Sequence, residues 1–152
     1  MNTQILRTTS QNPDFINLVK LLDSYLKIVD GDDHAFYDQY NSIEDLKMVV
    51  VLYKNEQAVA CGSIKKYDSD SVEVKRMFTL LEERGNGLAS VVLTELENWA
   101  SETGYASCIL ETGHKQVEAI ELYKKNGYTN IPNYGQYAQI ENSVCFKKLL
   151  TI

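Results

Sequence analysis

The chain has 152 residues, of which 44% are hydrophobic and 24% are charged, and its net charge is −6. This size and composition are typical of a soluble globular protein, so we predict a single domain over residues 1–152. The acidic balance argues against sequence-independent nucleic-acid binding, which depends on basic surface. Apolar runs stay short of the ~20 residues that a membrane-spanning helix needs, and the start lacks a signal-peptide pattern, so we expect no membrane partner.

The cysteines and histidines are too few and too scattered for a metal site or a disulfide framework. Cys61, Cys108 and Cys145 form no C-x-x-C pair, and we expect buried, reduced thiols in a reducing cytoplasm. His34 flanks a predicted helix start and His114 lies in a Gly-His-Lys turn. Both histidines are therefore interpreted as surface residues, and no metal is expected.

The first half of the chain predicts a strand, two helices and an antiparallel meander. Apolar residues recur at helical spacing after Pro13, and Gly31 ends that pattern, after which Asp33 can cap a second short helix. The predicted strands here are 4–9, 46–54, 58–67 and 72–80, with tight turns at 55–56 and 68–70.

The second half predicts a strand–helix–strand crossover followed by further mixed elements. The expected elements are a helix from 88 to near 104, a strand at 105–111, a helix at 116–126, a short strand from 128 and a last strand at 143–148. Because the crossover joins two neighbouring strands, strands 72–80 and 105–111 should be parallel. The fold class is therefore α/β (α+β), with a mixed central sheet and about four helices.

A glycine turn stands where the predicted strand 72–80 gives way to the helix. Gly85-Asn86-Gly87 supplies a G-x-G, which favours binding of an anion at the helix N-terminus. A dinucleotide-binding fold is one interpretation, with Glu111 as the ribose-binding acid. Ser90 stands where its third glycine should be, however, and the chain has one parallel crossover where that fold needs several, so we set it aside. There is no G-K-[S/T] of a phosphate-binding P-loop either.

The alternative includes the arginine before the turn. Arg84-x-x-Gly87-x-Ala89 resembles the [Q/R]-x-x-G-x-[G/A] pattern of the GNAT acetyltransferases. The preceding VEVKRMFTLLEE is similar to the central strand of that family, and EAIELYKKNGY is similar to its late helix. The resemblance covers nearly the whole chain and is strongest to small bacterial members. It implies the GNAT fold, with a splayed parallel strand pair, and acetyl-CoA as co-substrate.

The resemblance also implies which residues bind acetyl-CoA. Backbone groups of the central strand would hold the pantetheine arm, and the turn with the first helical residues would hold the pyrophosphate. The expected cofactor-binding residues are Met77, Phe78, Thr79, Arg84, Gly85, Asn86, Gly87, Leu88 and Ala89. Arg84 is expected to contribute mainly its backbone N–H.

Two residues are candidates for the acid–base chemistry. Tyr123 matches the tyrosine that many family members place beside the CoA sulfur, where a phenol can donate a proton. Glu73 lies at the position, relative to Arg84, where histone-acetylating members carry their basic glutamate. Glu73 could instead pair with Lys75 or Arg76, and Tyr123 could be an ordinary packing residue. Glu111 is the second candidate for the base.

The acceptor is expected to be a primary amine. Residues 30–45 hold six acidic residues and no lysine or arginine, and Tyr37, Tyr134, Tyr137 and Glu111 are the predicted substrate-binding residues. Such a mouth suits a cationic amine, although a solvated acidic surface explains the same pattern. We predict direct acetyl transfer to a small-molecule or protein amine. The alternative is a non-catalytic acyl-CoA-binding or sensing module, and a homodimer is left open.

Overall fold

The computed structural model describes residues 2–31 and 45–150. The second predicted helix and Tyr37 lie outside these residues. The strands are β1 (Thr3–Thr8), β2 (Met48–Lys54), β3 (Gln57–Lys66), β4 (Ser71–Thr79), β5 (Ser107–Gly113), β6 (Thr129–Ile131) and β7 (Ser143–Leu149). The helices are α1 (Pro13–Asp30), α3 (Leu88–Glu102) and α4 (Val117–Lys125), with short 3-10 turns η2 (Leu81–Glu83) and η3 (Gly135–Tyr137).

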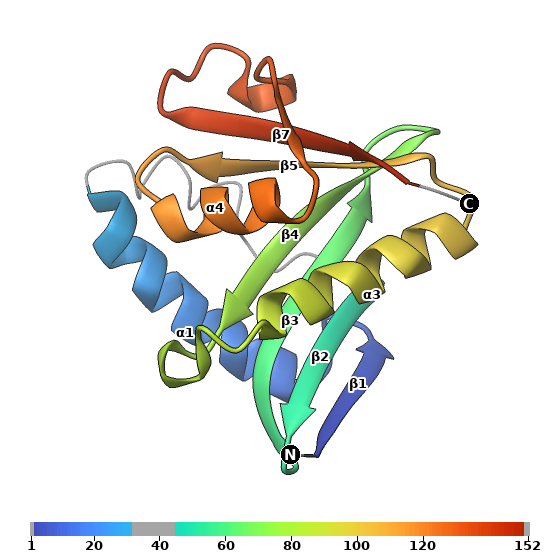
Figure 1. Ribbon diagram of the computed structural model, residues 1–152, viewed down its shortest axis with the longest axis vertical. Coiled ribbons are helices and arrows are strands. Elements are labelled where there is room, and N and C mark those ends of the chain that lie inside the picture. The colour runs from blue at the N-terminus through green and yellow to red at the C-terminus, as the bar shows by residue number, and fades with distance from the viewer. Residues whose placement is uncertain (1, 32–44, 151–152) are drawn as a thin grey trace.

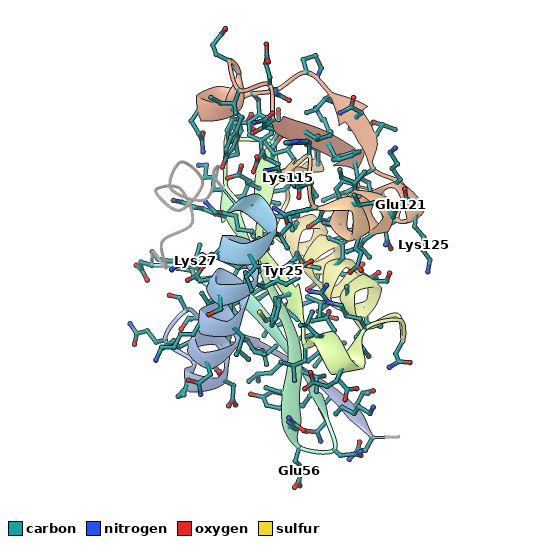
Figure 2. All side chains as sticks on the ribbon, turned by 90° about the vertical axis from the view of Figure 1, so that its left-hand side faces the viewer. Tyr25, Lys27, Glu56, Lys115, Glu121 and Lys125 are labelled. Atoms are coloured by element: carbon teal, nitrogen blue, oxygen red, sulfur yellow. The ribbon has the colours of Figure 1, made fainter. Side chains whose placement is uncertain are left out.

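The strands form one sheet in the order β1-β2-β3-β4-β5-β7-β6. The pairing of β4 with β5 is parallel, and the other pairings in the sheet are antiparallel. Helix α1 lies on one face of the sheet, and α3 and α4 lie on the other (Figures 1 and 2). The mixed sheet with one parallel pair is therefore confirmed.

Local sequence signals explain most of the element ends. The side chain of Asn12 caps α1 by accepting from the backbone N–H groups of Asp14 and Phe15. Asn55 and Glu56 both have positive φ values, 49° and 70°, which suits the tight β2–β3 hairpin. Figure 2 shows Glu56 at the tip of that hairpin. Gly127, at φ 89°, follows the end of α4 as predicted.

The parallel pair is short, and this creates the opening in which the site lies. β4 and β5 are paired only at Ser71–Ser107, Val72–Cys108 and Glu73–Ile109. Beyond these pairs the strands diverge, and β5 and β7 cross the direction of β4 at a wide angle in Figure 1. The predicted splay of the parallel pair is thus present.

The core fills both faces of the sheet with apolar side chains. The face of α1 contributes Phe15, Leu18 and Val19, and that of α3 contributes Val92 and Leu96 among others, all buried. All three cysteines are buried and free, as predicted. Within the described ranges, no helix is long and apolar enough to cross a membrane.

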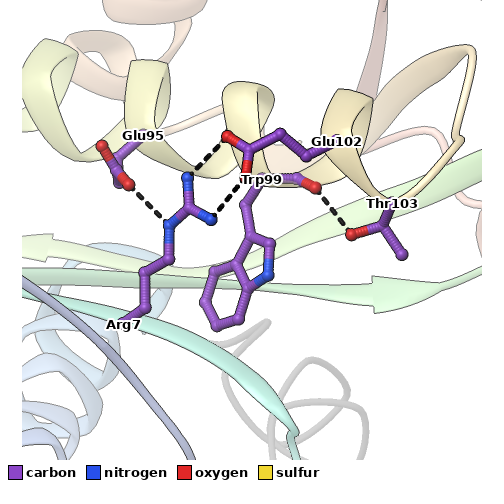
Figure 3. A network of polar contacts seen from close by, with 5 residues as sticks. All are labelled: Arg7, Glu95, Trp99, Glu102 and Thr103. Atoms are coloured by element: carbon purple, nitrogen blue, oxygen red, sulfur yellow. Dashed lines mark hydrogen bonds and ion pairs between the residues drawn. The ribbon is translucent and has the colours of Figure 1, made fainter.

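The edge strand β1 is tied to α3 by one arginine. Arg7 donates two hydrogen bonds of 2.9 Å to the carboxylate of Glu102 and one of 2.6 Å to Glu95. Its guanidinium lies 5.0 Å from the centre of the Trp99 ring, and Figure 3 shows these side chains together. Bidentate pairing and contact with an aromatic face make this a well-defined attachment of the edge strand.

Candidate active site

A cavity of about 670 Å³ lies where β4 and β5 diverge. Its walls come from α1, β4, the glycine turn, the start of α3, β5 and α4. Among the predicted residues, the lining includes Glu73, Met77, Phe78, Thr79, Arg84, Gly85, Gly87, Leu88, Ala89, Glu111, Tyr123 and Tyr137. Residues predicted from separate motifs therefore meet in one cavity.

The glycine turn presents open backbone to this cavity. Gly85 and Gly87 have φ values of 84° and 76°, which L-residues with a Cβ rarely adopt. A Cβ built at either position meets no atom within 4 Å. Gly87 is the N-cap of α3 and offers no side chain to the free N–H groups of the first turn. Asn86 does not line the cavity; its side-chain amide donates to the carbonyl of Glu83 over 3.2 Å.

The side chain of Arg84 does more than the sequence predicts. Its guanidinium lies 4.6 Å from the centre of the Tyr25 ring on α1, and it donates to Glu118 on α4 over 2.9 Å. A further hydrogen bond reaches the carbonyl of Thr79. Tyr25 lies on the side of α1 that faces the rest of the molecule, opposite Lys27 (Figure 2). Arg84 therefore joins the two helices that flank the cavity.

A bulge in β4 contains Met77 and directly precedes Phe78 and Thr79, the strand residues predicted to bind the pantetheine arm. Cys61 is opposite Phe78 and Ser63 is opposite Lys75, so two residues of β4 face the single Gly62 of β3. A Cβ at Gly62 would lie 2.4 Å from the sulfur of Met77. A side chain at this position would displace that of Met77, so glycine suits the close packing. The two β4 residues opposite Gly62, Arg76 and Met77, leave the regular β3–β4 pairing beside the cavity.

Glu73 is held by two contacts. The Tyr134 hydroxyl donates to one carboxylate oxygen over 2.5 Å, and the ammonium of Lys75 lies 3.9 Å from the other. Arg76, the other partner considered from the sequence, instead pairs with Asp23 over 3.0 Å. Tyr134 does not line the cavity itself. It contacts the cavity through its hydrogen bond to Glu73.

Glu111 is the second carboxyl group considered as the base, and its pKa is raised. Burial raises its pKa to about 7, against a partial opposing effect of the hydrogen bond from Ser143. The nearby charges of Glu73 and Asp30 raise the pKa further, and that of Lys75 lowers it. The hydroxyl of Ser143 donates to Glu111 over 2.7 Å. A carboxyl group with such a pKa can both take and release a proton near neutral pH.

Tyr123 lies on α4 with only 6% of its surface exposed. Its ring packs edge-on against Tyr128 and tilted against Phe146, with centroids 5.7 and 6.2 Å away. Burial, with a smaller effect of the Glu111 charge, raises the pKa of its hydroxyl above the usual range. The phenol therefore stays protonated at neutral pH and is available as a proton donor.

Tyr137 is the second predicted substrate-binding tyrosine that the structure describes. It is buried, lines the cavity and packs at 88° against the ring of Tyr134. Burial and the charges of Glu111 and Glu73 raise the pKa of its hydroxyl above the usual range. The loop before β7 thus supplies Tyr137 to the cavity lining and, through Tyr134, a hydrogen bond to Glu73.

Asp30 is one of the six acidic residues counted in 30–45 but not singled out from the sequence as a site residue, and it lines the cavity. Asp30 ends α1 with 2% of its surface exposed and accepts a hydrogen bond of 3.4 Å from Gln116. Asp30 follows the buried Leu22 and Leu26 at helical spacing. An acidic residue on an otherwise apolar helix face is the sequence feature that indicates a buried functional carboxyl group. Tyr25 was missed as well; nothing in its local pattern distinguishes it from a packing tyrosine.

The residues present fit a long polar ligand such as acetyl-CoA. Open backbone at the glycine turn offers N–H groups to phosphates, and the cavity continues from there to Glu111 and Tyr123. Thr79 and Thr112 line it from the two diverging strands, and neither buried hydroxyl oxygen has a hydrogen-bond partner within residues 2–31 and 45–150. Unsatisfied buried hydroxyls in the wall of a cavity are compatible with a polar occupant such as water or a ligand.

Comparison with known proteins identifies the family. Residues 15–128 match the model of the Acetyltransferase (GNAT) family. The chain is 29% identical over 98% of its length to the IAA acetyltransferase of Azospirillum brasilense, covering 99% of that protein. It is 27% identical to a structure from Klebsiella pneumoniae assigned provisionally as an acyl-CoA N-acyltransferase, with a TM-score of 0.83 and 98% of both chains covered.

A more distant structure shares the fold. The paiA N-acetyltransferase of Thermoplasma acidophilum, in complex with coenzyme A, is 14% identical with a TM-score of 0.73, and 98% of this chain and 99% of that chain are covered. The family match extends over most of the chain and includes the glycine turn and the Tyr123 helix. The chain therefore belongs to the GNAT family of acetyltransferases and is an acyltransferase enzyme.

Proposed function

We propose that this enzyme transfers the acetyl group of acetyl-CoA directly to a primary amine. The observation that carries the proposal is the presence of Glu111, with a pKa of about 7, and the protonated Tyr123 in one cavity. Direct transfer needs a group that accepts the amine proton and a group that protonates the departing sulfur. Glu111 would accept the amine proton, and Tyr123 would protonate the departing sulfur.

Glu111 is proposed as the base in preference to Glu73. A general base is most effective when its pKa lies near the working pH, and burial raises the pKa of Glu111 to about 7. The oxygens of Glu73 already lie near the Tyr134 hydroxyl and the Lys75 ammonium. We assign Glu73 the role of a neighbouring charge that helps to raise the pKa of Glu111.

Tyr123 is proposed as the acid. The helix α4 and the packing of its ring against Tyr128 and Phe146 fix the direction of the phenol. When the acetyl thioester is bound, it supplies the activated carbonyl and the thiolate leaving group. The hydroxyl of Tyr123 would donate its proton to that sulfur and regain one from solvent or product in the next cycle.

The cofactor would be held by backbone groups of two segments. The turn of Arg84, Gly85, Asn86 and Gly87, with the following Leu88 and Ala89, supplies N–H groups for the pyrophosphate. Met77 lies in the bulge, and Phe78 and Thr79 pair with β3 but lie beyond the three pairs that join β4 to β5. Their backbone groups on the β5 side would hold the pantetheine arm and the carbonyl oxygen.

The acceptor side of the cavity favours a cationic amine. Asp30, Glu73 and Glu111 lie there together, with Lys75 as the nearby cation and Tyr137 as an aromatic wall. A free ammonium group is attracted to such a wall and must lose a proton before attack. Small-molecule amines and lysine side chains share this chemistry.

The alternative is an acyl-CoA-binding module without turnover, and one assay separates the two. Purified protein is given acetyl-CoA and a panel of amines, and thiol release is measured with wild type, Glu111→Gln and Tyr123→Phe. We expect amine-dependent release by wild type and a large loss in both variants. Tight acetyl-CoA binding without release for any amine, equal in all three proteins, would favour the sensing module.

A further inference from the structure

The bulge of β4 contains a residue with a strained backbone, and hydrogen bonds from β3 hold it. Arg76 has a φ of 60°, in the region that residues with a Cβ rarely adopt. The thiol of Cys61 donates to its carbonyl over 3.4 Å, and the hydroxyl of Ser63 donates to the carbonyl of Lys75 over 3.1 Å. Such a conformation persists only when its surroundings enforce it.

The side chain of Arg76 is buried and has a partner outside the sheet. Only 3% of the side chain is exposed, and its Nη1 donates to Asp23 of α1 over 3.0 Å. Its Nε has no hydrogen-bond partner in the described part of the chain. Asp23 is 41% exposed in its side chain and does not line the cavity, whereas Arg76 does.

We propose that Asp23 is a positioning residue for acetyl transfer, acting through Arg76 on the bulge. The ion pair holds the guanidinium on the α1 side of β4, and this keeps Arg76 at its positive φ. The following residues, Met77 and Phe78, then present their backbone to the cavity in the geometry that the thioester carbonyl needs. This inference rests on the proposed function for its catalytic consequence.

The physical reason lies in the cost of leaving a buried charge without its partner. A guanidinium that loses its carboxylate in such a place must move toward water or remain poorly satisfied. Either change removes the restraint on the strained backbone, so the extra residue in β4 can shift and realign with Gly62. Small displacements of groups that hold a reacting carbonyl have large effects on rate.

The test is Asp23→Asn, with Asp14→Asn as the matched control. Both acids lie on α1 outside the cavity, and Asp14 accepts a hydrogen bond of 2.6 Å from Tyr53 of β2. We expect Asp23→Asn to lower kcat by about tenfold or more while the Kd for acetyl-CoA changes by less than about threefold. Asp23→Glu should restore most of the rate, and Asp14→Asn should change thermal stability alone.

A second readout does not depend on turnover. In amide NMR spectra, Asp23→Asn should shift the Met77 and Phe78 signals, and Asp14→Asn should leave them in place. If the wild-type protein acetylates no amine, the proposed function fails. The shifts of the Met77 and Phe78 amide signals then test whether Asp23 positions the bulge. A folded Asp23→Asn variant with wild-type kcat and unmoved amide signals overturns the inference, as does a loss of thermal stability at unchanged kcat.

Discussion

The Tyr134 hydroxyl donates a 2.5 Å hydrogen bond to Glu73, joining the loop before β7 to the last residue of β4 that pairs with β5. The ring of Tyr134 is packed edge-on against Tyr67 on one side and Tyr137 on the other, so the donor is held in position. Glu73, one of the two candidate bases, therefore already accepts a hydrogen bond from a fixed tyrosine. Glu111, on the facing strand, keeps a pKa near neutrality.

The first prediction separates the two acids by the pH dependence of the rate. If Glu111 takes the amine proton, wild-type kcat/KM should rise as pH increases through about 7, because the carboxyl group is deprotonated above its pKa. Glu111→Gln should lose this rise and fall by roughly 10² to 10⁴ in rate at neutral pH. Steady-state kinetics from pH 5.5 to 9 at saturating acetyl-CoA measures the profile.

Glu73→Gln is the companion variant. It removes a negative charge that helps to raise the pKa of Glu111, so the rise in rate should move to lower pH while most of the activity remains. The opposite pattern, with Glu73→Gln inactive and Glu111→Gln retaining a wild-type profile, would make Glu73 the base.

The second prediction concerns the proton donor. Tyr123→Phe keeps the ring contacts with Tyr128 and Phe146 but removes the hydroxyl. Turnover should fall by roughly 10²-fold or more, and the Kd for acetyl-CoA, measured by calorimetry, should barely change. A loss below about threefold, within ~1 kcal/mol, would leave Tyr123 as a packing residue.

The third prediction tests the cofactor site. Gly87→Glu places a side chain and a negative charge in the open space beside the glycine turn, so acetyl-CoA binding should be abolished. Gly104→Glu is the matched control: Gly104 has a φ of 101°, equally open surroundings and no place in the cavity lining. Both variants carry backbone strain, but only the first should lose affinity in calorimetry. Equal affinities in folded proteins would refute the site.

The fourth prediction concerns stability and involves no cavity residue. Arg7→Met removes the contacts to Glu95, Glu102 and Trp99 that hold β1 against α3 (Figure 3). We expect Tm to fall by about 3 °C or more, with kcat and KM unchanged. Arg7→Lys should recover only part of the loss, because an ammonium group cannot form the bidentate contact. An unchanged Tm for Arg7→Met would mean that the network contributes nothing measurable.

Local chemistry made several elements predictable from the sequence alone. The apolar stripes of α1 and α3 follow the helical period, and the Asn55-Glu56 turn begins with an asparagine, a residue that tolerates positive φ. The glycine turn and the Tyr123 helix are readable because a tight approach of backbone to an anion, and a helix ending at glycine, require particular residues at particular spacings. Residues of both motifs line the cavity, among them Gly85, Gly87 and Tyr123.

The choice between the two acids depended on the tertiary structure. The pKa of Glu111 reflects burial and groups on three other elements, namely Ser143 on β7, Glu73 on β4 and Asp30 on α1. These residues are far apart in the chain, and no local pattern specifies how close they come. The side chain of Arg84 was likewise expected to be incidental, yet it joins α1 and α4. Electrostatic effects act through space, so the sequence named the candidate acids and only the packing of the strands and helices distinguished them.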